Sequence, residues 1–176
     1  MGTPQGFPHH ARVFPGRQAA VPPTFVHSPG RMNPTPDTLT VAVTVNSTLE
    51  RAWQAFTTPQ DITQWNFASA DWCCPASQVD LREGGRFSAR MEARDGSMGF
   101  DFSGLYTHVD PCRELRFVLG EQLGAGREVV VQFQAQGDAV LVSETFTPEN
   151  VYSLEQQRAG WQSILEQYKR HVEAKA

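Results

Sequence analysis

Alternating apolar and polar positions run through the middle of the chain and predict β-strands. Alternation places every second side chain on one face of a strand, and β-branched and aromatic residues favour such positions. The clearest case is Leu39–Val45, where leucine and three valines alternate with threonine and alanine. On this basis strands are expected at residues 39–45, 78–81, 86–93, 100–109, 114–119, 127–134 and 139–146.

Two short helices are expected after the first strand. Leu49, Trp53 and Phe56 are spaced i, i+4 and i+7, which is one face of a helix. Pro59 disfavours helical geometry at the residue before it, so this helix ends near residue 57. The same proline suits the first turn of a second helix over residues 60–64.

A long helix is expected from about Ser153 to about Glu173. Its apolar stripe has helical spacing and consists of Leu154, Arg158, Trp161, Leu165, Tyr168 and Val172. It is the only element long enough to cover the apolar face of a seven-stranded, mostly antiparallel sheet. The predicted fold class is therefore α+β, with a curved sheet wrapped on the C-terminal helix and a gap between them that suits a small apolar ligand.

One aromatic segment, Trp65–Pro75, has neither helical nor strand periodicity. It carries two tryptophans, a phenylalanine and two adjacent cysteines, whereas surface loops are usually small and polar. Its rings must therefore be buried or line a cavity. We expect a loop at the rim of the gap, in which Asn66 supplies a polar contact.

The chain is expected to divide into a leader, residues 1–38, and a folded domain, residues 39–176. Eight of the twelve prolines precede Leu39, and proline removes a backbone donor and restricts its predecessor. The leader should be disordered or loosely extended. Met32 is an alternative first residue, which would make residues 1–31 no genuine part of the protein.

Composition and charge narrow the possible functions. The net charge of −4 argues against nucleic acid as a partner, and no basic helix face suggests a membrane surface. Three cysteines do not make a disulfide framework, and the chain begins with no secretory signal. Reduced thiols indicate a cytoplasmic protein.

Glu144 is the most informative candidate for chemistry. It is in phase with Val140, Val142 and Phe146, so alternation turns its carboxylate inward. A buried carboxylate needs a partner or a raised pKa, and such groups collect at functional sites. The candidate partners are Tyr106, His108 and Arg158. The alternative is a glutamate near a strand end that reaches solvent.

Two further residues, His108 and Tyr106, share the phase of one strand and are candidates for acid–base chemistry with Glu144. A solvated histidine near a strand end is the alternative for His108. Adjacent Cys73 and Cys74, with Cys112, do not match the usual spacing of a zinc chelate, so neither a metal nor another cofactor is expected.

The in-phase apolar residues and the aromatic segment define the expected ligand contacts. They form either the lining of a cavity or a solid core, since apolar stripes normally pack a core. The set comprises Trp53, Trp65, Asn66, Phe67, Trp72, Phe87, Met91, Phe100, Phe102, Tyr106, Val131, Phe133, Val142 and Trp161.

The element order and several motifs resemble a known family. The motifs are Val45–Thr57, Trp65–Ala68 with Trp72 and Pro75, Leu81–Phe87, Gly104–Tyr106 before Val109–Pro111, Glu144–Phe146, and Gly160–Trp161 with Ile164 and Leu165. Over about residues 39–174 the chain is similar to the START-like (Bet v 1-like, SRPBCC) superfamily, and within it to the activator-of-heat-shock-protein-90-ATPase homologue group.

The resemblance implies a helix-grip fold and a small hydrophobic cavity ligand, apolar or amphipathic, bound between the sheet and the C-terminal helix. It also allows an enzyme of polyketide cyclase/dehydratase or hydrolase type, using Glu144 with His108 or Tyr106. A third possibility is a chaperone-ATPase co-factor, although the leader has no counterpart in the group.

Overall fold

The computed structural model describes residues 38–120 and 126–174. The predicted leader, apart from residue 38, lies outside these ranges. The elements, in chain order, are β1 (Leu39–Val45), α1 (Leu49–Thr57), α2 (Pro59–Trp65), β2 (Trp72–Val79), β3 (Arg86–Ala93), β4 (Gly99–Asp110), β5 (Glu114–Leu119), β6 (Arg127–Gln136), β7 (Ala139–Phe146) and α3 (Leu154–Ala174).

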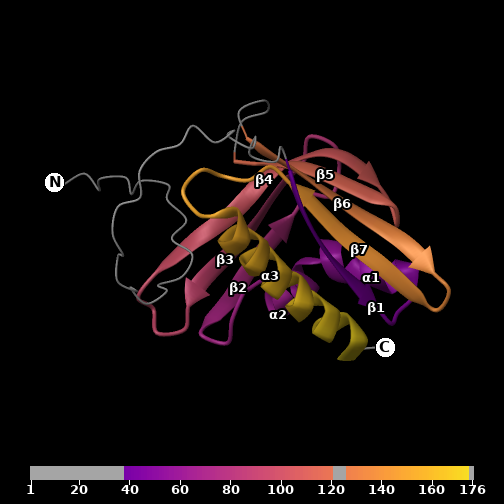
Figure 1. Ribbon diagram of the computed structural model, residues 1–176, viewed down its shortest axis with the longest axis horizontal. Coiled ribbons are helices and arrows are strands. Elements are labelled where there is room, and N and C mark those ends of the chain that lie inside the picture. Colours follow the sequence, from indigo (N-terminus) through magenta and orange to yellow (C-terminus); the bar gives the residue numbers. More distant parts are fainter. Residues whose placement is uncertain (1–37, 121–125, 175–176) are drawn as a thin grey trace, which may run out of the picture. The chain divides into compact units, whose positions relative to one another are not determined.

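The seven strands form one curled sheet in the order β1-β7-β6-β5-β4-β3-β2, and each neighbouring pair is antiparallel. Helix α3 crosses one face of this sheet, with α1 and α2 near its C-terminal half (Figure 1). We call this helix-covered side the inner face. The predicted α+β helix-grip architecture is therefore confirmed.

Alternation in the sequence becomes alternation in burial. In β1, Leu39, Val41, Val43 and Val45 are buried while the residues between them are exposed. In the adjacent β7, Val140, Val142, Glu144 and Phe146 are likewise buried. The core accordingly lies between the inner face of the sheet and the three helices.

Side chains of α3 close the free edge of β1. Gln162 accepts from the Ala42 N–H at 3.3 Å and donates its amide Nε2–H to the Ala42 carbonyl at 3.0 Å. Farther along, Glu173 accepts from the Asn46 N–H at 2.9 Å. These contacts satisfy backbone groups that an edge strand would otherwise offer to another chain.

The aromatic segment Trp65–Pro75 is not one loop, which corrects the prediction. Its first residue ends α2, and β2 begins at Trp72, six residues before the expected strand at 78–81. The register of β2 against β3 shifts between Cys73 and Ala76. This irregularity breaks the two-residue alternation of side chains, and Pro75 has no N–H to donate to the neighbouring strand. The sequence pattern therefore did not indicate a strand here.

A second irregularity lies in β4 and changes which face His108 occupies. Tyr106 pairs with Phe117 and His108 pairs with Arg116, so the register shifts between them. An inserted residue in one strand reverses the phase of every side chain after it. The predicted shared face of Tyr106 and His108 is therefore wrong.

Candidate functional site

The inner face is packed solidly at one end, which we call the closed end. Five aromatic residues from α1, α2, β6 and α3 meet there, each with no more than a small exposed fraction. Neighbouring rings contact one another mostly edge to face, with centroids 5.2–5.7 Å apart. Such contacts stabilise a core beyond the area they bury. The residues are Trp53, Phe56, Trp65, Phe133 and Tyr168.

Trp65 belongs to this core and not to a rim, contrary to the prediction. Its side chain and backbone together are only 4% exposed, and its indole N–H donates to the Ala55 carbonyl at 2.9 Å. Tyr168 packs against it and donates its hydroxyl to the Ala52 carbonyl at 2.6 Å. Both aromatic residues thereby tie neighbouring elements to α1.

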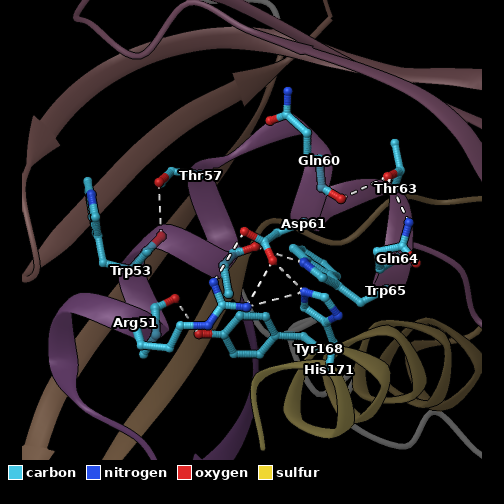
Figure 2. A network of polar contacts seen from close by, with 12 residues as sticks. Arg51, Trp53, Thr57, Gln60, Asp61, Thr63, Gln64, Trp65, Tyr168 and His171 are labelled. Carbon is cyan, nitrogen blue, oxygen red and sulfur yellow. Dashed lines mark hydrogen bonds and ion pairs between the residues drawn. The ribbon is translucent and has the colours of Figure 1, made fainter. Parts of the chain in front are cut away.

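A charged network joins the three helices beside the closed end (Figure 2). Arg51 of α1 donates to both carboxylate oxygens of Asp61 in α2, at 2.9 and 3.3 Å. His171 Nε2 of α3 lies 2.5 Å from Asp61 Oδ1. Burial alone would raise the pKa of Asp61, but the hydrogen bonds from Arg51 and His171 outweigh it and lower this pKa to about 2. The carboxylate therefore stays ionised.

The other end of the inner face, which we call the open end, carries aromatic side chains that are only partly covered. Trp161 of α3 stacks on Phe146 of β7 with centroids 4.1 Å apart and meets Phe102 of β4 at 6.1 Å. Three strand spacings separate β7 from β4, so one indole reaches both because the sheet curls around α3. Phe87 contacts Phe102 and Tyr106 on the same face.

The predicted ligand contacts thus separate into two groups. Six remain partly exposed: Phe67, Trp72, Phe87, Phe100, Phe102 and Trp161. The other eight are buried: Trp53, Trp65, Asn66, Met91, Tyr106, Val131, Phe133 and Val142. Among the partly exposed residues, Phe87, Phe102 and Trp161 contact one another at the open end, whereas several of the buried residues pack the core.

Glu144 points to the inner face, as alternation predicts. It is 6% exposed and pairs in register with Val41 on one side and Val131 on the other. Within residues 38–120 and 126–174, no hydrogen bond or ion pair reaches its carboxylate. Burial raises the pKa of Glu144 to about 8, so the group is largely protonated at neutral pH.

None of the three candidate partners contacts Glu144. His108 is 45% exposed and pairs with Glu83, with Nδ1 3.1 Å from the carboxylate oxygen. Arg158 is exposed on α3. Tyr106 is buried, which raises the pKa of its hydroxyl. It sits three strands from Glu144, about 14 Å along the sheet.

The cysteines are not gathered into one site. Cys73 and Cys74 lie on β2, whereas Cys112 lies in the turn between β4 and β5. Burial raises the pKa of Cys74 to about 11, which keeps its thiol protonated and weakly nucleophilic.

A hollow of about 610 Å³ lies away from the inner face, beside the turn between β4 and β5. Its lining includes Arg113, Gln132, Leu141 and Ser143. The strand residues among them have the phase opposite to the buried positions of β6 and β7. The hollow therefore belongs to the outer face, and Phe133 is the single expected ligand contact among its lining residues.

The Arg51–Asp61–His171 network was not predicted from the sequence. An acidic residue in the first turn of α2 and a histidine in the last turn of α3 are ordinary choices at helix ends. Nothing in their spacing indicates contact, because 110 residues separate Asp61 from His171. Only the packing of the three helices brings them together.

The curled antiparallel sheet, the long C-terminal helix and the two short helices after β1 define a helix-grip protein. The chain belongs to the family described as activator of Hsp90 ATPase homolog 1-like protein, whose model matches residues 46–173. This match and the similar structures confirm the predicted family and support a ligand-binding domain of that family. No curated protein matches the chain.

Solved structures agree with this family. An AHSA1-like protein from Aeromonas hydrophila is 42% identical, covers 78% of this chain and 94% of its own, and superimposes with a TM-score of 0.70. A protein from Cytophaga hutchinsonii is 38% identical over 79% of this chain and 94% of its own, with a TM-score of 0.66. A Nitrosomonas europaea protein, 18% identical over 78% of this chain and 95% of its own, shares the fold with a TM-score of 0.65.

Across the described residues, none of the helices has the length and apolarity needed to cross a membrane.

Proposed function

We propose that the protein binds a small apolar or amphipathic ligand between the open end of the sheet and α3. The observation that carries this proposal is the difference in packing between the two ends of the inner face. Aromatic side chains are fully packed at the closed end, whereas Phe87, Phe102 and Trp161 remain partly exposed at the open end, near a buried carboxyl that has no hydrogen-bond partner among the described residues. Partly covered aromatic surface with few polar groups is typical of small-molecule sites.

A neutral fluorescent probe tests this proposal. N-Phenyl-1-naphthylamine should bind saturably and gain fluorescence on leaving water. Phe102→Ala removes an inner-face ring that contacts Trp161 and Phe87, and should weaken binding about tenfold, since a buried aromatic ring contributes more than 1.4 kcal/mol.

The matched control is Val130→Ala. Val130 lies in β6 between the buried Val129 and Val131, so its side chain is on the outer face. This variant should bind the probe like the wild-type protein. Absence of saturable binding by the wild-type protein, or equal weakening in both variants, would contradict the proposal.

Glu144 favours a second candidate function, an enzyme in which this residue is a general acid. A carboxyl group that remains protonated near neutral pH can protonate a leaving oxygen, as dehydration and hydrolysis require. His108 takes no part in this version, because it is exposed and paired with Glu83. Tyr106 is too distant to share a proton with Glu144 directly.

The test for catalysis is turnover of compounds that bind the open end. β-Hydroxyketones that bind should form enones as Glu144 protonates the leaving hydroxyl and the resulting carboxylate removes the α-proton, so that water leaves and the carboxyl is regenerated. Enone absorbance measures this reaction, and Glu144→Gln should abolish it while leaving binding intact. Binding without any turnover by the wild-type protein would leave the binding function standing and refute the enzymatic one.

A further inference from the structure

Among the residues that the structure describes, no positively charged side chain forms an ion pair with Glu144. It is flanked by Val41 on β1 and Val131 on β6, and its own strand places Val142 and Phe146 beside it on the same face. The titratable group that interacts with it electrostatically is Tyr168 of α3, whose hydroxyl is already bound to a backbone carbonyl.

Tyr168 also interacts electrostatically with two charged residues of the network. Arg51 and Asp61 both act on Tyr168, but they bind each other and His171. Across the sheet, Tyr106 offers only an uncharged hydroxyl. The described part of the chain therefore offers no group that satisfies the Glu144 carboxyl, which leaves its hydrogen-bonding positions open to a ligand or to water.

The protonation state of Glu144 determines which group fits. A neutral carboxyl has one O–H donor and a carbonyl acceptor, whereas an isolated carboxylate in an apolar site is strongly disfavoured. Burial raises the pKa of Glu144 to about 8, so the neutral form prevails at pH 7. An anionic ligand group beside it would meet no countercharge, and a cationic one would have to displace its proton.

Building on the binding function above, we propose that the ligand has an uncharged oxygen acceptor, such as a carbonyl, that receives a hydrogen bond from the Glu144 carboxyl. Its apolar body packs on the partly exposed rings of Phe102 and Trp161 at the open end. The site accordingly selects neutral, oxygen-bearing aromatic or alicyclic compounds over anionic amphiphiles of the same size.

Three naphthalenes that differ only in their polar group test the proposal: 2-acetonaphthone, 2-naphthoate and 2-(aminomethyl)naphthalene. At pH 6.5 the ketone should bind the wild-type protein about tenfold more tightly than the carboxylate, because both can accept the Glu144 hydrogen bond but only the carboxylate buries a charge that has no countercharge. Above pH 8 the ketone should weaken progressively, approaching about tenfold per pH unit, as Glu144 loses its proton.

Two substitutions separate hydrogen bonding from shape. Glu144→Gln keeps a donor that does not titrate, so ketone binding should persist and lose its dependence on pH. Glu144→Leu has no donor and should weaken ketone binding about tenfold at pH 6.5. Circular dichroism of each variant checks that it is folded.

The outcomes distinguish the two proposals. Two results would overturn the inference about the polar group while apolar binding stands. In the first, the naphthalenes bind but Glu144→Leu leaves the ketone affinity unchanged. In the second, the amine binds most tightly and its affinity rises from pH 6 to 8. If neither these compounds nor N-phenyl-1-naphthylamine binds the wild-type protein, the binding function itself is refuted.

Discussion

Trp65 at the closed end and Trp161 at the open end are the same residue in two different settings. Trp65 is enclosed by α1, α2 and α3, and its indole N–H is bound to a backbone carbonyl. Trp161 has one ring stacked beneath it and remains partly exposed. The difference arises because α1 and α2 cover only the part of the sheet near the C-terminal half of α3. One end is therefore enclosed by three helices, and the other leaves aromatic surface partly exposed.

The largest expected effect comes from exchanging each tryptophan for alanine. Trp65→Ala should lower the free energy of unfolding by about 4 kcal/mol, because a large cavity and an unsatisfied carbonyl remain. Trp161→Ala should cost about 1–2 kcal/mol, because its site can fill with water. Urea denaturation measures both. Equal losses would show that the two ends do not differ in packing.

Glu144 lies between the two ends and should make stability depend on pH. Its folded pKa of about 8 exceeds its ordinary value of 4.5, so it adds no penalty below pH 4.5 and destabilises the fold increasingly as pH rises to 8. Glu144→Gln should therefore equal the wild-type protein at pH 4 and exceed it by about 4 kcal/mol at pH 8. Denaturation at both pH values measures this, and a constant difference would contradict it.

The Arg51–Asp61–His171 network supports the closed end. Asp61→Asn should lower stability by about 2 kcal/mol at pH 7, because charge-assisted hydrogen bonds to Arg51 and His171 are lost. The folded pKa of Asp61, about 2, is below the ordinary 3.8, so its contribution is complete above pH 4 and is lost as pH falls toward 2.

Asp101→Asn is the control for this prediction. Asp101 also faces an arginine, Arg90, but at 3.5 Å and with 66% of its side chain exposed. Exposed ion pairs contribute little. Thermal denaturation should show little change for Asp101→Asn, and a loss matching that of Asp61→Asn would refute the special role of the network.

The smallest expected effect concerns the attachment of α3 to the edge of β1. Gln162→Ala removes both hydrogen bonds to Ala42 and should cost about 1 kcal/mol. It should also expose the strand edge and increase self-association at high protein concentration, measured by sedimentation velocity. Gln167→Ala removes only a contact to Arg170 on the same helix and should change neither quantity.

The fold could be read from the sequence to a large extent because its elements follow local periods. Six of the seven strands lie within one or two residues of the expected ranges, and β2 was misplaced where a register shift and Pro75 break the alternation. The inward direction of Glu144 also followed from alternation, since β7 is regular along its whole length. The family resemblance rested on the same residues and is confirmed.

The candidate site was predicted less completely, because its composition depends on contacts between distant segments. The register shift in β4 turns His108 outward, and no local sequence pattern predicts this shift. Trp65 and Trp161 are both aromatic residues on helices, and the sequence does not indicate which of them two further helices will cover.

The sequence by itself determined the strands, the helices, the helix-grip architecture and the inward phase of Glu144, because side-chain direction along a regular element depends only on local backbone geometry. The tertiary structure alone decided that Glu144 has no partner in the described part of the chain, that Asp61 has two, and that the inner face is closed at one end and open at the other. These properties depend on how segments more than a hundred residues apart pack against one another.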